Sequence, residues 1–250
     1  MMKIPKSHPR YESLTIREKL AEGFREGFVH ETGLIAHGRG EAFDYLIGEK
    51  TIDISNDAEK VATALLLVAE NPVISINGNT AALVGKDCVE LSKKIPAKLE
   101  VNLFHRSEDR IRKIVMELKK FGADPVLGEN PDARIEGLDH PRGLCSREGI
   151  YSADVVLVPL EDGDRCEALI KMGKKVIAID LNPLSRTSQS ATITIVDNVV
   201  RAIPNMIKWT DILKDRPKEY LEALVNSWDN KKYLRDVLSY ISKRLSKYPL

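Results

Sequence analysis

The chain has 250 residues, of which 43% are hydrophobic and 30% are charged. This composition supplies enough apolar material for a folded core and excludes a disordered chain. Because 38 Lys and Arg residues nearly balance 37 Asp and Glu residues, the net charge is only +1, and the sequence lacks the broad positive field of a general nucleic-acid binder.

The cysteine content and the short apolar segments indicate a reducing, aqueous compartment. The three cysteines, Cys88, Cys145 and Cys166, form no C-x-x-C pair, which argues against a disulfide framework or a zinc ribbon. The longest aliphatic run, which starts at Val61, is about half of the ~20 residues needed to span a bilayer. We therefore expect a cytoplasmic protein that does not enter a membrane, with Cys88 in its core.

The N-terminal part of the chain predicts helices. The segment from Thr15 to Glu18 reads as a capping box, and apolar residues at helical spacing follow it, so we expect a first helix that starts there and runs to about His30. The glycines of the next stretch predict a loop over residues 35–40 between helices. A further helix is expected over roughly 55–70.

From residue 72 onward, short runs rich in β-branched residues alternate with helical segments. The expected strands are PVISIN, KLEVNLF, ADVVLVPL, KVIAID and ATITIV, and the expected helices lie near 80–95, 107–122, 163–173 and 197–208. Strands that are apolar at nearly every position suit a parallel sheet that is buried on both faces. The predicted fold is therefore α/β and Rossmann-like, with a mostly parallel sheet and helices on both faces.

This pattern divides a single domain, residues 1–250, into three parts. An N-terminal helical segment over 1–70 precedes the Rossmann-like core over 71–208, and two apolar stripes predict C-terminal helices over 209–250. Within the core, the stretch from Gly128 to Gly149 is the longest without clear periodicity. A loop of that length is either functional or partly disordered, and the sequence does not decide between the two.

Ligands of open α/β sheets bind beyond the carboxyl ends of the strands, where helix N-termini present backbone N–H groups. The first such junction is Asn77-Gly78-Asn79-Thr80, directly after PVISIN. Gly78 lets the backbone approach a ligand, and Thr80 or Asn79 can cap the helix while other N–H groups bind a phosphate. The same residues also suit a plain strand-to-helix turn. Neither a dinucleotide fingerprint nor a Walker A loop is present.

Two further junctions carry charged residues. The second strand ends in Phe104-His105-Arg106, and Arg106 beside the expected N-cap Ser107 can clamp a phosphate, although such residues at strand ends are often only solvated. The acidic residues over 161–165 follow the third strand. They can hold Mg²⁺ or an incoming ammonium group, and simple helix capping explains them equally well.

The junction after KVIAID is the richest in polar groups. Asp180 can accept ribose hydroxyl groups, and Arg186, Thr187 and Ser188 offer donors to phosphate oxygens, unless this stretch is only a polar surface loop. The last junction, Asp197-Asn198-Val199, begins a helix, and Asp197 can be simply the cap of that helix.

Two N-terminal arginines complete the candidate set. Arg17 lies in the first helical turn, and Arg39 stands between two glycines, which indicates either a backbone that approaches a ligand closely or a helix C-cap. The sequence contains no G-x-S-x-G elbow and no H-E-x-x-H motif, so covalent and zinc-dependent hydrolysis lack support. The basic residues of the last helix lie mostly off its apolar stripe, which favours a solvated face over a nucleic-acid patch.

Four segments, IPKSHPRYESL, GLIAHGRGEAFDYLIGE, INGNTAAL and DLNPLSRTS, resemble the archaeal phosphopantothenate synthetases, which are the 4-phosphopantoate:β-alanine ligases of coenzyme A biosynthesis. The resemblance covers essentially the whole chain. It implies a Rossmann-like homodimer that condenses 4-phosphopantoate with β-alanine and converts ATP to AMP and diphosphate through an acyl-adenylate. It also implies ATP contacts at Arg17, Arg39, Asp180, Leu181, Asn182, Arg186, Thr187, Asn198 and Val199.

A reaction of this kind needs two aligned anions and positive charge near the phosphates, but no enzyme nucleophile. We therefore expect Arg39 and Arg186 to stabilise charge, Mg²⁺ to accompany ATP, and the substrate's own phosphate to bind at Asn77, Gly78, Asn79, Thr80 and Arg106. The sequence identifies no general base for the amine and no basis for β-alanine selection. The alternative function is a non-catalytic regulatory module that binds ATP, whereas an NAD(P) oxidoreductase lacks its glycine fingerprint.

Overall fold

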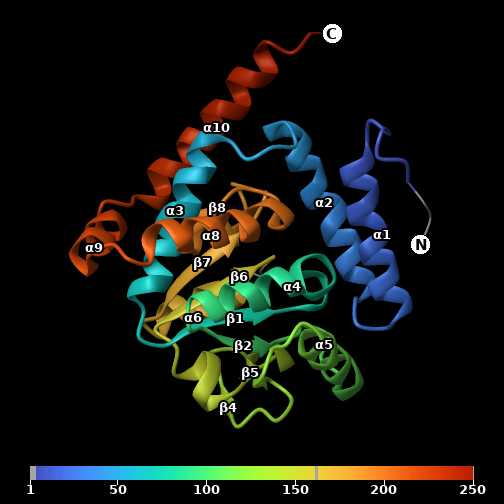
Figure 1. The fold of residues 1–250 in the computed structure, drawn as a ribbon, viewed down its shortest axis with the longest axis vertical. Coiled ribbons are helices and arrows are strands. Elements are labelled where there is room, and N and C mark those ends of the chain that lie inside the picture. The colour runs from blue at the N-terminus through green and yellow to red at the C-terminus, as the bar shows by residue number, and fades with distance from the viewer. Residues whose placement is uncertain (1–3, 161–162, 250) are drawn as a thin grey trace.

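The computed structural model describes residues 4–160 and 163–249 and shows a six-stranded parallel sheet at the centre of the molecule (Figure 1). The strands follow the order β3-β2-β1-β6-β7-β8, and every neighbouring pair is parallel. Their bounds are β1 Pro72–Ile76, β2 Lys98–Val101, β3 Val126–Leu127, β6 Val155–Pro159, β7 Lys175–Ile179 and β8 Ile193–Ile195. The expected α/β fold with a parallel sheet is confirmed, and its strand order reverses between β1 and β6.

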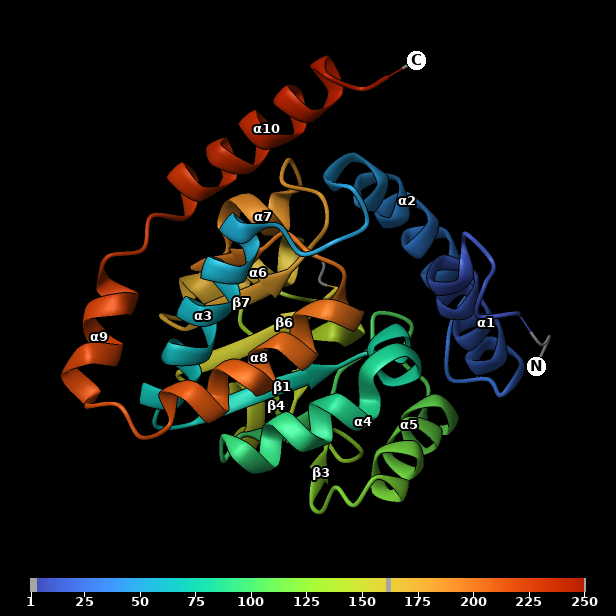
Figure 2. The ribbon, with the colours of Figure 1, turned by 45° about the horizontal axis from the view of Figure 1, so that its top comes forward.

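Helices cover both faces of the sheet, because alternate strand residues point to opposite faces and nearly all of them are apolar. The helices are α1 Tyr11–Arg25, α2 Glu31–Ile47, α3 Asp53–Val68, α4 Gly78–Lys94, α5 Glu108–Lys120, α6 Gly163–Lys171, α7 Arg186–Ser190, α8 Val199–Leu213, α9 Lys218–Asn226 and α10 Asn230–Ser246. The face that carries Ile74 packs against α3, α4, α5 and α8, and the face that carries Val73 packs against α6 (Figure 2). Cys88 is fully buried in the first of these cores, as predicted.

The described helices add one finding on membranes. Within residues 4–160 and 163–249, no helix combines the length and the apolar character that a membrane span requires.

The C-terminal helices α9 and α10 bury Leu221, Leu234, Val237 and Ile241 as the apolar stripes predict, whereas Leu245 near the end of α10 is 47% exposed. The sequence analysis missed β3, because two residues are too few to form a pattern.

The first helix starts before the predicted capping box, so that prediction is wrong. α1 begins at Tyr11, and the Thr15 hydroxyl donates a hydrogen bond to the Tyr11 carbonyl at 2.7 Å, one turn inside the helix. This bond to the preceding turn allows a threonine to lie in a helix interior instead of capping it. α1 ends at Arg25 rather than near His30, because Gly27 adopts a φ of 84° and turns the chain.

The predicted loop over residues 35–40 is also wrong, because α2 runs without a break from Glu31 to Ile47. His30 caps this helix, since its Nδ1 accepts a hydrogen bond from the Thr32 N–H at 3.2 Å. The glycines serve packing instead of ending the helix. A Cβ at Gly33 would lie 2.4 Å from Asn79 Oδ1 on α4, whereas a Cβ at Gly38 would meet nothing within 4 Å.

This difference between two glycines of one helix gives a stability prediction. Gly38→Ala is expected to stabilise the protein by roughly 0.5–1 kcal/mol, because alanine loses less backbone entropy in a helix. Gly33→Ala is expected to destabilise it, because the new methyl group displaces the Asn79 side chain, which donates to the Gly33 carbonyl. Thermal unfolding of both variants measures the effect, and equal shifts in Tm would contradict the assigned role of Gly33.

Candidate functional site

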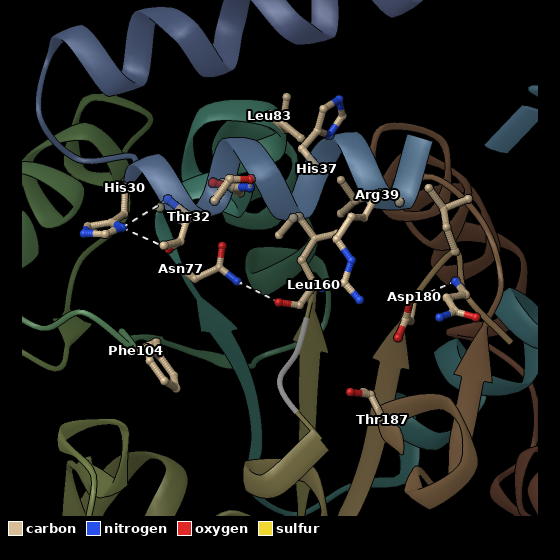
Figure 3. Close-up of a pocket in the computed structure, with 18 of the residues that line it drawn as sticks. His30, Thr32, His37, Arg39, Asn77, Leu83, Phe104, Leu160, Asp180 and Thr187 are labelled. Carbon is tan, nitrogen blue, oxygen red and sulfur yellow. Dashed lines mark hydrogen bonds between the residues drawn. The ribbon is translucent and has the colours of Figure 1, made fainter. Parts of the chain in front are cut away.

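A cavity of about 390 Å³ lies between α2 and the carboxyl ends of β1, β6 and β7 (Figure 3). This is the side of the sheet, and the reversal of strand order, at which open α/β folds bind ligands. Leu160, directly after β6, lines the cavity with a φ of 57°, a left-handed conformation that is uncommon for leucine. The predicted residues that line the cavity are Arg39, Asn77, Gly78, Asn79, Asp180, Leu181, Asn182, Thr187, Asn198 and Val199.

Four predicted residues do not line the cavity. Arg17 pairs with Glu41 at 2.5 Å, and Arg186 pairs with Asp164 at 2.7 Å and Glu167 at 3.0 Å. Thr80 is buried, and its hydroxyl contacts Asn77 Oδ1 at 3.1 Å and the Pro159 carbonyl at 3.3 Å. Arg106 donates to the Gly128 carbonyl at 2.7 Å.

The acidic junction predicted over 161–165 is described only in part. Glu161 and Asp162 lie outside the described residues, and Gly163 begins α6. Asp164 forms the ion pair with Arg186. Arg165 is buried and donates to Ser75 Oγ at 3.0 Å and to Asn102 Oδ1 at 2.7 Å, so this arginine supports the core beside β1 and β2.

Asp180 organises one end of the cavity. Its Oδ1 accepts the Asn182 N–H at 2.9 Å, and its Oδ2 accepts the Ser185 hydroxyl at 2.5 Å. Burial raises the pKa of Asp180, while these hydrogen bonds and the nearby charge of Arg39 oppose the rise. Ser185 in turn caps α7, so the stretch predicted as a possible surface loop is a hydrogen-bonded structure that presents Asn182 and Thr187 to the cavity.

The start of α8 joins this end of the cavity to α2. Asn198 caps α8, since its Oδ1 accepts the Val200 N–H at 3.3 Å, so Asp197 is not the cap. Asn198 Nδ2 donates to Asp44 Oδ2 on α2 at 2.8 Å, and Arg201 pairs with the same Asp44 at 2.6 Å. The Asp197 carboxylate instead accepts a hydrogen bond from Arg201 at 2.5 Å, because Arg201 lies one helical turn after Asp197.

α2 thus covers the cavity like a roof, and hydrogen bonds hold it to α8 on one side and to α4 on the other. Asp44 ties its C-terminal half to α8, and Asn79 Nδ2 donates to the Gly33 carbonyl at 2.8 Å, which ties its N-terminal half to α4. Asn77, rather than Asn79 or Thr80, caps α4 through the Thr80 N–H at 2.9 Å. From this roof, the exposed side chain of Arg39 points toward the ends of β6 and β7 (Figure 3).

The opposite end of the cavity, which we call the cationic end, consists of His30, His105, Arg110 and Arg142. Sequence reasoning named the junction at His105 but missed His30, Arg110 and Arg142. A single arginine inside an amphipathic helix such as α5 reads as a solvated residue, and Arg142 lies in the stretch without periodicity. One signal was available, because His105 lies two residues before the predicted N-cap Ser107. A helix that starts at Ser107 has Arg110 in its first turn, close to the end of the preceding strand.

The stretch from Gly128 to Gly149 places Arg142 at the cationic end of the cavity. It contains β4 Ala133–Arg134, which pairs with β5 Leu144–Cys145, and is therefore structured. Buried Glu100 of β2 accepts the N–H groups of Ser146 at 2.8 Å and Ile150 at 2.7 Å. Burial raises the pKa of Glu100 to about 7, against the effect of these two bonds. Asn102 Nδ2 donates to the Arg142 carbonyl at 3.1 Å.

The cavity therefore combines a polar end at Asp180 with a cationic end, under one roof. This arrangement suits the binding of two anionic groups side by side, because guanidinium groups and helix N-termini both attract negative charge. Within residues 4–160 and 163–249, no group of three His, Cys, Asp or Glu side chains is placed to hold a metal ion.

Known proteins resemble this chain over nearly its full length. The family model described as phosphopantothenate/pantothenate synthetase matches residues 54–244. The chain is 56% identical to the 4-phosphopantoate--beta-alanine ligase of Thermococcus onnurineus (strain NA1), over 99% of this chain and 95% of that protein. Proteins of the same name from Methanosarcina mazei and Methanospirillum hungatei are 56% and 53% identical, over 98% and 97% of this chain and 96% and 98% of their own lengths. The chain belongs to the phosphopantothenate/pantothenate synthetase family, as the sequence motifs predicted.

Proposed function

We propose that this protein is a ligase that condenses 4-phosphopantoate with β-alanine to 4′-phosphopantothenate, with conversion of ATP to AMP and diphosphate, in coenzyme A biosynthesis. The observation that carries the proposal is the 56% identity over 99% of the chain to a protein named for this ligase activity. The cavity supports it, because one pocket with a polar end and a cationic end suits a nucleotide and a second anion.

The proposed chemistry follows from the poor reactivity of a carboxylate. In the first step, a carboxylate oxygen of phosphopantoate attacks the α-phosphorus of ATP, and diphosphate leaves. In the second step, the neutral amine of β-alanine attacks the acyl carbon, AMP leaves, and the amine nitrogen releases its proton. No enzyme nucleophile takes part, so the protein contributes alignment and positive charge.

The described residues have distinct roles in this proposal. Asp180 and Asn182 would bind the ribose or base, and Arg39 would lie over the phosphates from the roof of the cavity. Asn198 and Val199 would present the N-terminus of α8 to the nucleotide. Arg17 and Arg186 stay predictions, and in this structure Arg17 pairs with Glu41 and Arg186 pairs with Asp164 and Glu167.

Two further parts of the proposal concern Mg²⁺ and the oligomeric state. Mg²⁺ would accompany ATP, held mainly by phosphate oxygens of the nucleotide, a common arrangement for this ion. We also propose a homodimer. Ile35 on α2 is 66% exposed and Leu245 on α10 is 47% exposed, so these apolar side chains offer surface to a second subunit.

A product assay tests the proposed function. We expect AMP to form only when ATP, 4-phosphopantoate and β-alanine are all present, with one AMP for each amide, whereas ATP and 4-phosphopantoate alone should release at most about one diphosphate per active site. Omission of β-alanine should stop turnover after the first step. ATP binding without release of diphosphate would favour the regulatory module, and formation of ADP would contradict the acyl-adenylate route.

A further inference from the structure

Four polar side chains, Asp44, Asp197, Asn198 and Arg201, join α2 to the start of α8, and we call this set the roof network. The Arg201 guanidinium lies between two carboxylates, with its Nη2 at 2.6 Å from Asp44 Oδ1 and at 2.5 Å from Asp197 Oδ1. Its Nε also donates to Asp197 Oδ1 at 2.8 Å. Asn198 Nδ2 donates to Asp44 Oδ2 at 2.8 Å, so both oxygens of Asp44 accept hydrogen bonds from the start of α8.

The roof network is shielded from water and contains two carboxylates for one guanidinium. Asp44 and Asp197 are buried, and Arg201 is mostly buried. Burial lowers the pKa of Arg201, but the hydrogen bonds and charges of the two carboxylates outweigh burial and raise it. Arg201 and Asp197 alone would form a neutral pair, so charge balance in the core does not require Asp44. What Asp44 adds is the contact between α2 and α8.

Residues next to the roof network line the cavity. Phe43 directly precedes Asp44, and Gly40 lies one helical turn before it on α2. Asn198 lines the cavity from the other side. Arg39 belongs to the same helix as Asp44, and its side chain points toward the ends of β6 and β7 (Figure 3). A shift of α2 relative to α8 would therefore move Arg39 relative to the strand ends.

The other contacts of α2 do not fix its C-terminal half over the cavity. Glu41 pairs with Arg17 of α1 at 2.5 Å, which joins α2 to another outer helix. The bond from Asn79 to the Gly33 carbonyl lies about 16 Å along the helix axis from Asp44. The helices α1 and α10 pack against α2 from outside the cavity lining. Loss of the roof network would therefore free the half of α2 that carries Arg39.

We propose, on the basis of the ATP-dependent function proposed above, that Asp44 and Arg201 are positioning residues, which hold α2 at the distance from α8 at which Arg39 reaches the ATP phosphates. Neither of them lines the cavity, so both act through Arg39 and not by contact with the nucleotide. Reactions that depend on alignment are sensitive to such supports, because a misplacement of about 1 Å can cost about 100-fold in rate.

A double-mutant cycle on nucleotide affinity tests the proposal. The full chain is titrated calorimetrically with α,β-methylene-ATP, which resists cleavage at the α-phosphorus. Arg39→Ala and Asp44→Asn are each expected to raise the Kd of this analogue about 10-fold, within the range of one charge-assisted hydrogen bond. If Asp44 acts through Arg39, the double variant should bind no more than about 20-fold more weakly than the wild type, whereas independent effects would multiply to about 100-fold.

Asp44→Asn suits this test because it keeps the shape of the side chain and leaves Arg201 paired with Asp197, so the fold should persist. Thermal unfolding of the same samples checks that point. Asp211→Asn is the matched control, since it removes another carboxylate that joins α8 to a second helix, through Lys94 at 2.6 Å, and it should leave Kd within about twofold. Arg201→Lys keeps the charge but not the planar geometry that bonds both carboxylates, so it should raise Kd about 3- to 10-fold.

An unchanged Kd for Asp44→Asn, or losses that multiply in the double variant, would overturn the positioning role. If Asp44→Asn does not fold, Arg201→Lys takes its place in the cycle under the same criterion. The ligase function is judged separately, by formation of AMP. A non-additive cycle in a protein that forms no AMP would reject the ligase function and leave the positioning role standing, and a multiplicative cycle in a protein that forms AMP would do the reverse.

Discussion

Arg39→Ala is expected to lower kcat about 10²- to 10³-fold, the usual loss for a charge-assisted contact made in a transition state. Arg39 points from the roof of the cavity toward the strand ends, where the proposed reaction places negative charge on phosphoryl oxygens (Figure 3). Its side chain is exposed and makes no hydrogen bond or ion pair within residues 4–160 and 163–249, so its loss should leave the fold intact. Steady-state rates of AMP formation and thermal unfolding of the same samples measure the two effects.

Two variants serve as controls for Arg39. Arg39→Lys keeps the charge but not the planar, bidentate geometry, so it should recover only part of the rate. Arg235→Ala removes an exposed arginine from α10, outside the cavity, and should leave kcat within about twofold. If Arg39→Ala turns over at the wild-type rate, Arg39 has no part in the site.

Glu59→Gln is expected to change the pH dependence of stability strongly. Glu59 is fully buried in α3, where Asp197, Asn205 and Arg201 are its polar neighbours. Burial raises the pKa of Glu59 to about 9, and the charge of Asp197 acts in the same direction. At neutral pH the folded protein therefore holds this side chain protonated, whereas the unfolded chain ionises it at about 4.3.

The sign of the effect follows from proton binding. Between about pH 4.3 and pH 9, the folded state binds one more proton at Glu59 than the unfolded state, so the free energy of unfolding falls as the pH rises. The contribution is at most about 1.4 kcal/mol per pH unit. Glutamine cannot ionise, so the variant should gain stability relative to the wild type at pH 8 compared with pH 5.

Urea unfolding at pH 5, 6.5 and 8 measures this difference. Subtraction of the variant from the wild type removes the contributions of other raised carboxyl groups, such as Glu100 and Asp180, because both proteins contain them. Glu219→Gln changes an exposed carboxyl group on α9 and should give a difference that is flat with pH. A flat difference for Glu59→Gln would contradict the buried, protonated state of Glu59.

The fold was predictable where local pattern and burial agree. Runs such as PVISIN and KVIAID are apolar on both faces, so they predicted β1 and β7 of a parallel sheet. The glycines of α2 led to the wrong prediction of a loop over residues 35–40, because glycine usually marks a loop. Gly33 is required for the contact between α2 and Asn79, and such a contact between distant segments leaves no local signal.

The candidate site was predictable at strand ends and not elsewhere. Asp180 and Asn198 follow strands directly, so the topology of the sheet brings them together. Arg110 and Arg142 reach the cavity from the first turn of α5 and from an irregular stretch, and their positions depend on tertiary hydrogen bonds made by Phe28 and Asn102. Arg39 was predicted from its setting between two glycines and from the family motifs. No local pattern predicts that α2, which carries Arg39, covers the end of the sheet.

The central claim is that one cavity holds the nucleotide near Asp180, beneath Arg39, with the acid substrate extending toward the cationic end. A crystal structure of the protein with α,β-methylene-ATP and 4-phosphopantoate tests it most directly. We expect the adenosine next to Asp180 and Asn182, the ATP phosphates below α2, and the acid substrate at the cationic end. A nucleotide bound outside this cavity, or with its adenosine at the cationic end, would contradict the account.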